Sequence, residues 1–152
     1  MLADPAALAP SDRPAPGTFE AIYRALDSSS HHVIGPVHPR LLVIPIRAED
    51  GSVAGGLWGS TACRWLHVEM LFVPESQRGQ GIGSALVAAA ETEARRRGCL
   101  GVHVDAFSFQ AAPFYRRLGY TVFGVLEDFP PGHRRIFFRK RFDAPHCCAG
   151  SR

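Results

Sequence analysis

The chain has 152 residues, a length typical of one domain and sufficient to bury a sizeable core. Its composition, 46% hydrophobic and 20% charged, is that of an ordinary globular protein, and no apolar run approaches the roughly 18–20 residues that span a bilayer. A net charge of +3 is too small to indicate nucleic-acid binding. These features predict a soluble protein with neither a membrane nor a nucleic-acid partner.

Both ends of the chain are predicted to lie outside the folded domain. Residues 1–17 are rich in Pro and Ala and lack the basic start and long apolar stretch of a secretory signal, a pattern typical of a flexible arm. We therefore expect a cytoplasmic protein with one domain over residues 18–143 and a tail over residues 144–152.

The four cysteines indicate free thiols. Cys63, Cys99, Cys147 and Cys148 lack the paired spacing of a zinc site and are too few for a disulfide scaffold. We expect no metal, with capture of an ion by His146, Cys147 and Cys148 as the less favoured alternative.

The first half of the chain is predicted to form one helix and three strands. Apolar residues at steps of three and four predict an amphipathic helix over residues 18–28, and residues 29–39, with their Pro, Gly and His, predict a loop. Strands are expected over residues 41–48, 53–61 and 65–73. Their connections are too short to cross over between parallel strands, so the three should form an antiparallel meander.

Two helices and three strands follow, in the order helix, strand, helix, strand, strand. Their expected ranges are residues 81–97, 100–107, 110–118, 120–126 and 134–142. No internal repeat is evident.

A glycine-rich turn over Val73–Ser84 joins a strand to a helix. Free N–H groups at a helix start bind anions, and the helix dipole adds roughly 0.3–1 kcal/mol for a favourable charge. Arg78 lies at the positive end of this helix, where a cation is disfavoured unless an anion sits between them. No lysine follows the turn as a P-loop requires, and Ser84 stands where a dinucleotide fingerprint has glycine. The turn predicts a phosphate site, with a simple helix cap as the alternative.

Two motifs together resemble the GNAT superfamily of acyl-CoA-dependent N-acetyltransferases. Arg78-x-x-Gly81-x-Gly83 after a strand is similar to that family's acyl-CoA pyrophosphate motif, and Phe114–Tyr120 is similar to its second hallmark, a Tyr on a short helix followed by Gly and an aromatic residue. The resemblance covers about residues 53–142. It implies an α+β fold, in which flanking helices cover a central, mixed and mostly antiparallel sheet whose two central strands splay apart.

The resemblance also implies acetyl-CoA as co-substrate, without a metal. The strand end before the turn would hold the pantetheine and polarise the acetyl carbonyl, and the amides of the turn would bind the pyrophosphate. The residues concerned are Leu71, Phe72, Val73, Arg78, Gly79, Gln80, Gly81, Ile82, Gly83 and Ser84.

A base is needed because an alkyl amine of pKa near 10.4 is protonated at neutral pH, and freeing it costs about 4–5 kcal/mol. Strand periodicity places His67, Glu69, Leu71 and Val73 on one face, near the expected splay. We favour Glu69 as base, then His67. Asp105, on the other splayed strand, is a third candidate and could instead hold the substrate ammonium. A solvated Glu69 on an exposed face is the alternative.

Tyr115 is the candidate acid, able to donate a proton to the departing thiolate. Its alternative role is that of a packed aromatic beside Phe114. No Ser-His-Asp order or reactive Cys setting stands out, so direct transfer is preferred over a covalent acyl-enzyme.

The sequence departs from the family pattern in two places. Ser108 occupies a position where such enzymes often have an Asn, seven residues before the Tyr, and residues 1–17 contain no strand-like run where the family has its first strand. Either the acceptor region is reduced or a partner chain supplies that strand, and the second alternative makes a homodimer one expectation.

The acceptor is predicted least well. Trp58, Trp65, Phe107 and Phe109 could line its pocket, although such aromatics are more often core. Five basic residues on the last strand are interpreted as a solvated edge, with attraction of an anionic substrate or of the CoA 3′-phosphate as the alternative: Arg134, Arg135, Arg139, Lys140 and Arg141.

The sequence favours acetylation of a primary amine of a small molecule. A protein or peptide N-acetyltransferase comes second, and a non-catalytic CoA-binding sensor third.

Overall fold

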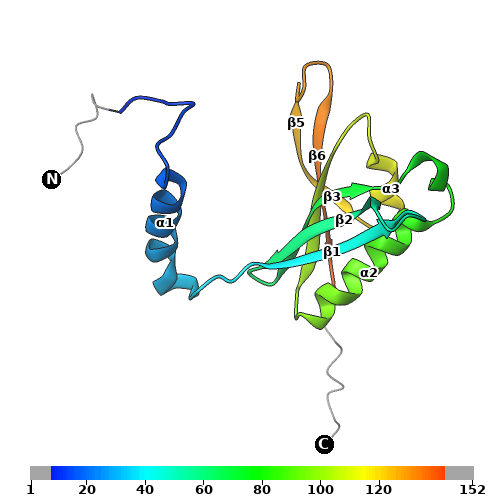
Figure 1. Ribbon diagram of the computed structural model, residues 1–152, viewed down its shortest axis with the longest axis horizontal. Helices are drawn as coiled ribbons and strands as arrows, with labels where there is room; N and C mark the ends of the chain where they lie inside the picture. The colour runs from blue at the N-terminus through cyan, green and yellow to red at the C-terminus, as the bar shows by residue number, and fades with distance from the viewer. Residues whose placement is uncertain (1–7, 143–152) are drawn as a thin grey trace, which may run out of the picture. The chain divides into compact units, whose positions relative to one another are not determined.

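The computed structural model describes residues 8–142, and its contacts divide the chain after Val37 into two units (Figure 1). The first unit contains helix α1, Thr18–Ile34. The domain bounds expected from the sequence, which join this helix to the rest, stay a prediction. None of the helices within the described residues is long and apolar enough to cross a membrane.

Helix α1 is longer than expected, since residues 29–34 continue the helix instead of forming a loop. Ser29 and Ser30 direct their hydroxyls to the carbonyl of Leu26 within the same helix. The first true helix breaker is Gly35, which has a positive φ of 71° and is followed by Pro36. Serines and histidines lower helix propensity without ending a helix, and the prediction was wrong there.

The second unit is built on one six-stranded sheet in the order β1-β2-β3-β4-β6-β5. The strands are β1 (Arg40–Arg47), β2 (Val53–Ala62), β3 (Trp65–Phe72), β4 (Gly101–Phe107), β5 (Thr121–Glu127) and β6 (Arg134–Arg141). The meander of β1, β2 and β3 is antiparallel, as expected, and β3–β4 is the parallel pair of the sheet. The element order and the mixed, mostly antiparallel sheet are confirmed.

Strands β3 and β4 pair over half of their length and then separate. Their ladder runs from the Trp65–Gly101 pair to the Val68–Val104 pair. Beyond it β3 stays paired with β2 as far as Phe72, and β4 stays paired with β6. The two central strands therefore diverge towards their C-terminal ends, as the family resemblance implied.

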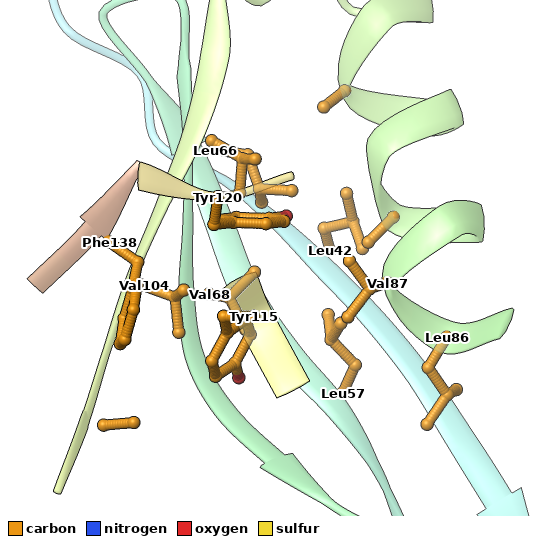
Figure 2. Close-up of a cluster of buried hydrophobic side chains, with 14 of the residues drawn as sticks. Leu42, Leu57, Leu66, Val68, Leu86, Val87, Val104, Tyr115, Tyr120 and Phe138 are labelled. Carbon is orange, nitrogen blue, oxygen red and sulfur yellow. The ribbon is translucent and has the colours of Figure 1, made fainter. Parts of the chain in front are cut away.

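The core lies on one face of the sheet, beneath α2 (Ile82–Arg96) and α3 (Ala112–Arg117). Helix α2 contacts β1 through β4 along this face (Figure 1). Figure 2 shows two tyrosines, Tyr115 and Tyr120, among the aliphatic side chains of the cluster. Its largest fully buried side chains are Leu57, Leu66, Val102 and Phe138, each worth about 1.5–3 kcal/mol when buried.

Strand β6 is an interior strand, which corrects the expectation of a solvated edge: it lies between β4 and β5. Two of its basic side chains reach carboxylates on neighbouring elements: Arg135 pairs with Asp105 of β4, and Lys140 Nζ donates to the buried Glu91 of α2 at 2.9 Å. The hydroxyl of Tyr120 donates to the same Glu91 carboxylate at 3.0 Å. The interior strand tolerates its charge because these two half-buried cations are paired and its other three basic side chains are exposed. Local sequence patterns do not show which strands lie beside it.

Candidate functional site

A cavity of about 1050 Å³ opens where β3 and β4 diverge. It is lined by Tyr115, Glu69 and Asp105 and by all the predicted cofactor-binding residues except Gln80, whose side-chain amide nitrogen donates to the carbonyl of Ser76 at 3.1 Å. The lining comes from the end of β3, the glycine-rich turn, the end of β4, α3 and Arg135 of β6. Segments distant in sequence are thus gathered around one space.

The glycine-rich turn forms one wall of this cavity. A short 3₁₀ helix, Glu75–Gln77, leads into it, and Gly79 and Gly81 adopt left-handed φ values of 74° and 81° that favour glycine. Within residues 8–142, the backbone N–H groups from Gly79 to Ser84 have no hydrogen-bond acceptor. Five of these six free donors belong to residues that line the cavity, namely Gly79 and Gly81 to Ser84, and donors at the start of a helix suit a phosphate group.

Arg78 braces this turn. Its Nε donates to the carbonyl of Val73 at 3.0 Å, and its guanidinium lies 3.4 Å from the exposed carboxylate of Glu75. An exposed ion pair of this length contributes little to stability. The hydrogen bond to Val73 ties the end of β3 to the glycines that follow it.

A bulge in β3 corrects the predicted set of side chains on one face. Gly59 of β2 lies opposite Val68 and Trp58 opposite Met70, so Glu69 is the extra residue. Its Oε1 accepts a hydrogen bond from the Ser60 hydroxyl at 3.0 Å.

Beyond the bulge the alternation of β3 is reset. His67 lies opposite Ser60, on the face shared with Glu69, whereas Leu71 lies opposite the buried Leu57 and packs against the core. The prediction that His67, Glu69, Leu71 and Val73 lie on one face of the strand was therefore wrong. It assumed that side chains alternate between the two faces without interruption, and a bulge interrupts that alternation.

The structure does not bring His67 to the cavity. Its ring stacks on that of His103 of β4 at 4.4 Å and 10°, and neither ring lines the cavity. Burial, together with the neighbouring charge of His67, holds the pKa of His103 below 6.5.

Tyr115 reaches the cavity from the helix-covered face of the sheet. Its side chain is 4% exposed and packs against the rings of Tyr120 and Phe138, each 5.5 Å away. Burial, and secondly the negative charge of Asp105, raise the pKa of Tyr115 to about 12. The phenol therefore keeps its proton throughout the physiological range.

Asp105 reaches the same cavity from the opposite face of β4. It accepts a hydrogen bond from the Nε of Arg135, and this bond raises the pKa of the guanidinium. Sequence reasoning grouped Arg135 with the basic residues of β6 without placing it at the site. The position of Arg135 at the site follows from the register between β4 and β6, because Arg135 lies opposite Phe107, two residues beyond Asp105.

The four aromatics considered for the acceptor pocket separate into two pairs. Phe107 and Phe109 line the cavity. Trp58 lines a separate shallow hollow, and Trp65 packs near His103. Ser108 binds the backbone of β6 instead of facing the cavity, since its hydroxyl accepts from the N–H of Arg134 at 3.1 Å.

No three His, Cys, Asp or Glu side chains come together as a metal site within residues 8–142. Cys63 and Cys99 are free thiols. The tail motif from His146 to Cys148 lies outside the described residues, and the expectation of a reaction without metal stays a prediction.

Known proteins share this sequence and fold. The model of the acetyltransferase (GNAT) family matches residues 11–120. An acetyltransferase of Agrobacterium fabrum is 47% identical over 108 residues, which are 71% of this chain and 79% of that protein. Blasticidin-S acetyltransferase of Streptomyces morookaense is 47% identical over 85 residues, 55% of this chain and 62% of that protein.

A crystal structure of an acetyltransferase from Agrobacterium tumefaciens superposes on the chain with a TM-score of 0.82 at 41% identity. The match covers 89% of this chain and 98% of that one. Sequence, fold and the two motifs agree. The chain therefore belongs to the GNAT family and is an acyl-CoA-dependent acetyltransferase.

Proposed function

We propose that this protein transfers the acetyl group of acetyl-CoA to a primary amine of a small molecule by direct attack. The observation that carries the proposal is one cavity with free backbone donors at one end and with Tyr115, Glu69 and Asp105 in its lining. Similarity to blasticidin-S acetyltransferase supports a small-molecule acceptor, and blasticidin S is a candidate substrate.

The cofactor end would hold acetyl-CoA through backbone groups. The free N–H groups from Gly79 to Ser84 would bind the pyrophosphate, and the backbone of Leu71, Phe72 and Val73 would hold the pantetheine where β3 leaves β4. The bound thioester supplies the activated acetyl group. The residues present fit this ligand. Gly79 and Gly81 have positive φ and open space around them, so the backbone N–H groups of the turn are free to bind it.

Glu69 would take the proton of the acceptor ammonium. Its carboxylate is exposed and receives one hydrogen bond, from Ser60, so it has free lone pairs towards the cavity. Asp105 already binds Arg135 and suits the other role considered for it, that of holding the ammonium in place. Two carboxylates with different partners therefore divide the two tasks.

Tyr115 would stabilise the departing sulfur. Its pKa of about 12 lies some 3–4 units above that of an ordinary thiol, so complete proton transfer to a free thiolate is uphill by roughly 5 kcal/mol. We therefore assign Tyr115 a hydrogen bond to the sulfur in which the phenol keeps its own proton, and the thiolate would take its proton afterwards from solvent, to which the cavity is open. A neutral phenol in a mostly buried setting is suited to that donation.

We also propose that the protein is cytoplasmic and forms a homodimer, as expected from the sequence. The family match begins at Ser11 and includes α1, which supports placing this helix in the acetyltransferase domain.

The test is calorimetric titration with acetyl-CoA, followed by thiol release against amines, amino acids, aminoglycosides, blasticidin S and peptides. Micromolar binding with release on a small amine is the expected result. Release on peptides alone would move the assignment to a protein N-acetyltransferase, and binding without release on any acceptor would favour a CoA sensor. Absence of binding would overturn the proposal.

A further inference from the structure

A group of aromatic side chains gathers at the cavity edge from two segments far apart in sequence. Phe107 is the last residue of β4 and Phe109 lies two residues further on, with ring centroids 5.2 Å apart and planes 5° from parallel. Phe129 and His133, from the connection between β5 and β6, meet them edge-on, with centroids at 5.9 Å from Phe107 and 4.9 Å from Phe109 respectively.

These rings are not buried as core residues are. Phe109 is 58% exposed and Phe129 is 43% exposed, whereas the core phenylalanine Phe138 is 0% exposed. Phe107 and Phe109 line the cavity itself. Exposed apolar rings at a cavity edge are disfavoured in water, and a planar ligand that stacks on them removes that cost.

The ion pair of Asp105 and Arg135 adjoins the rings. The guanidinium carbon lies 5.5 Å from the centroid of Phe107 and 5.3 Å from that of Phe129. Arg135 uses Nε for Asp105, and its Nη groups find no acceptor among residues 8–142. A ring with polar edge atoms can therefore stack on the phenyl groups and receive hydrogen bonds from these free donors.

An ammonium has one place in this lining to bind. Glu69 and Asp105 supply two negative charges and Arg135 is paired with Asp105, so the carboxylate of Glu69 is not neutralised by Arg135; the other cations of the lining are Arg78, in the glycine-rich turn, and Arg117 of α3. An acceptor that carries an ammonium beside a planar ring matches both parts of this arrangement.

We propose that Phe107, Phe109 and the Asp105–Arg135 pair form an acceptor subsite for amines that carry an aromatic or heteroaromatic ring near the reactive nitrogen. The inference rests on the proposed function and narrows its substrate class. Phe109 is the specificity residue of this subsite, because it lines the cavity and its ring stays 58% exposed although it contacts Phe107 and His133.

The test compares two amines with the same ethylamine arm, 2-phenylethylamine and 2-cyclohexylethylamine, at saturating acetyl-CoA. The wild type should prefer the aromatic amine in kcat/KM by roughly three- to tenfold, the value of one stacking contact. Phe109→Leu keeps an apolar side chain and should reduce that ratio to near one. Phe123→Leu is the matched control, since Phe123 is an equally exposed ring on β5 that does not line the cavity, and it should leave the ratio unchanged.

Other outcomes overturn the inference or separate it from the proposed function. Turnover with no ring preference, or a raised KM for acetyl-CoA with an unchanged ratio in Phe109→Leu, overturns the subsite and leaves the acetyltransferase standing. Calorimetric binding of the two amines in the presence of CoA gives the same comparison without turnover. Preferential binding of 2-phenylethylamine without acetylation would keep the subsite and refute the proposed reaction.

Discussion

The two ends of the cavity are built in different ways. The proposed cofactor end is made of backbone from consecutive residues, in which Gly79 and Gly81 set the path of the chain and the next residues begin α2. The proposed acceptor end is made of side chains from β3, β4 and β6, brought together by a bulge and by strand order. A site made of contiguous backbone can be recognised from a short sequence motif. A site made of side chains from several strands can be recognised only when the register of those strands is known.

The largest effect is expected from filling the cofactor end. A Cβ placed on Gly83 would lie 3.4 Å from the ring of Phe114 and 3.7 Å from Val73, so alanine fits but a larger side chain must enter the space between the turn and α3. We expect Gly83→Leu to weaken acetyl-CoA binding at least about 1000-fold, roughly 4 kcal/mol, measured by calorimetry.

Ala88→Leu is the control for this change, because Ala88 is an exposed position one turn further along α2. It should bind acetyl-CoA as the wild type does. Tight binding by Gly83→Leu, with a normal circular dichroism spectrum, would show that the ligand does not use this turn.

A pair of buried tyrosines separates chemistry from packing. Tyr115→Phe keeps the packed ring and removes the cavity hydroxyl, so kcat should fall about 100-fold with acetyl-CoA affinity within about twofold of the wild type. Tyr120→Phe removes the hydrogen bond to buried Glu91 and should lower the free energy of unfolding by about 1–3 kcal/mol, with kcat much less affected. Denaturant titrations and steady-state kinetics measure both. The opposite pattern would assign Tyr115 a packing role.

A smaller effect is expected at the acceptor end from Glu69→Gln. The cavity is open to solvent and Asp105 lies in the same lining, so part of the proton transfer can pass to water. We expect kcat/KM to fall about tenfold at neutral pH with unchanged acetyl-CoA affinity. A larger loss in Asp105→Asn than in Glu69→Gln, at equal stability, would exchange the roles of the two carboxylates.

The pH profile gives the subtlest comparison. Because the pKa of Tyr115 is raised to about 12, its proton-bearing form persists above pH 10, where an ordinary phenol ionises. The rate should therefore rise as the amine loses its proton and show no decline near pH 10. A descending limb near 10 that disappears in Tyr115→Phe would mean that the tyrosine titrates as an exposed one does.

The sequence predicted the order of the elements and the place of the glycine-rich turn well, because both rest on local signals. Glycines, helix periodicity and short connections place the turn, α2 and the meander without any tertiary information. The end of α1 was missed because its serines and histidines lower helix propensity, as loop residues do, without ending the helix. The separation of Glu69 from Leu71 and the interior place of β6 were missed because each depends on a partner strand. Arg135 shows the same limit, since its role appears when β6 is aligned with β4.

The most direct test of the account is amide-resolved hydrogen exchange with and without acetyl-CoA. We predict slower exchange confined to Leu71–Val73 and Gly79–Ser84, whose groups line the diverging strands and the start of α2. Protection of β1 or β5 instead, or unchanged exchange in the turn while acetyl-CoA is bound, would contradict the placement of the cofactor and with it the whole arrangement of the site.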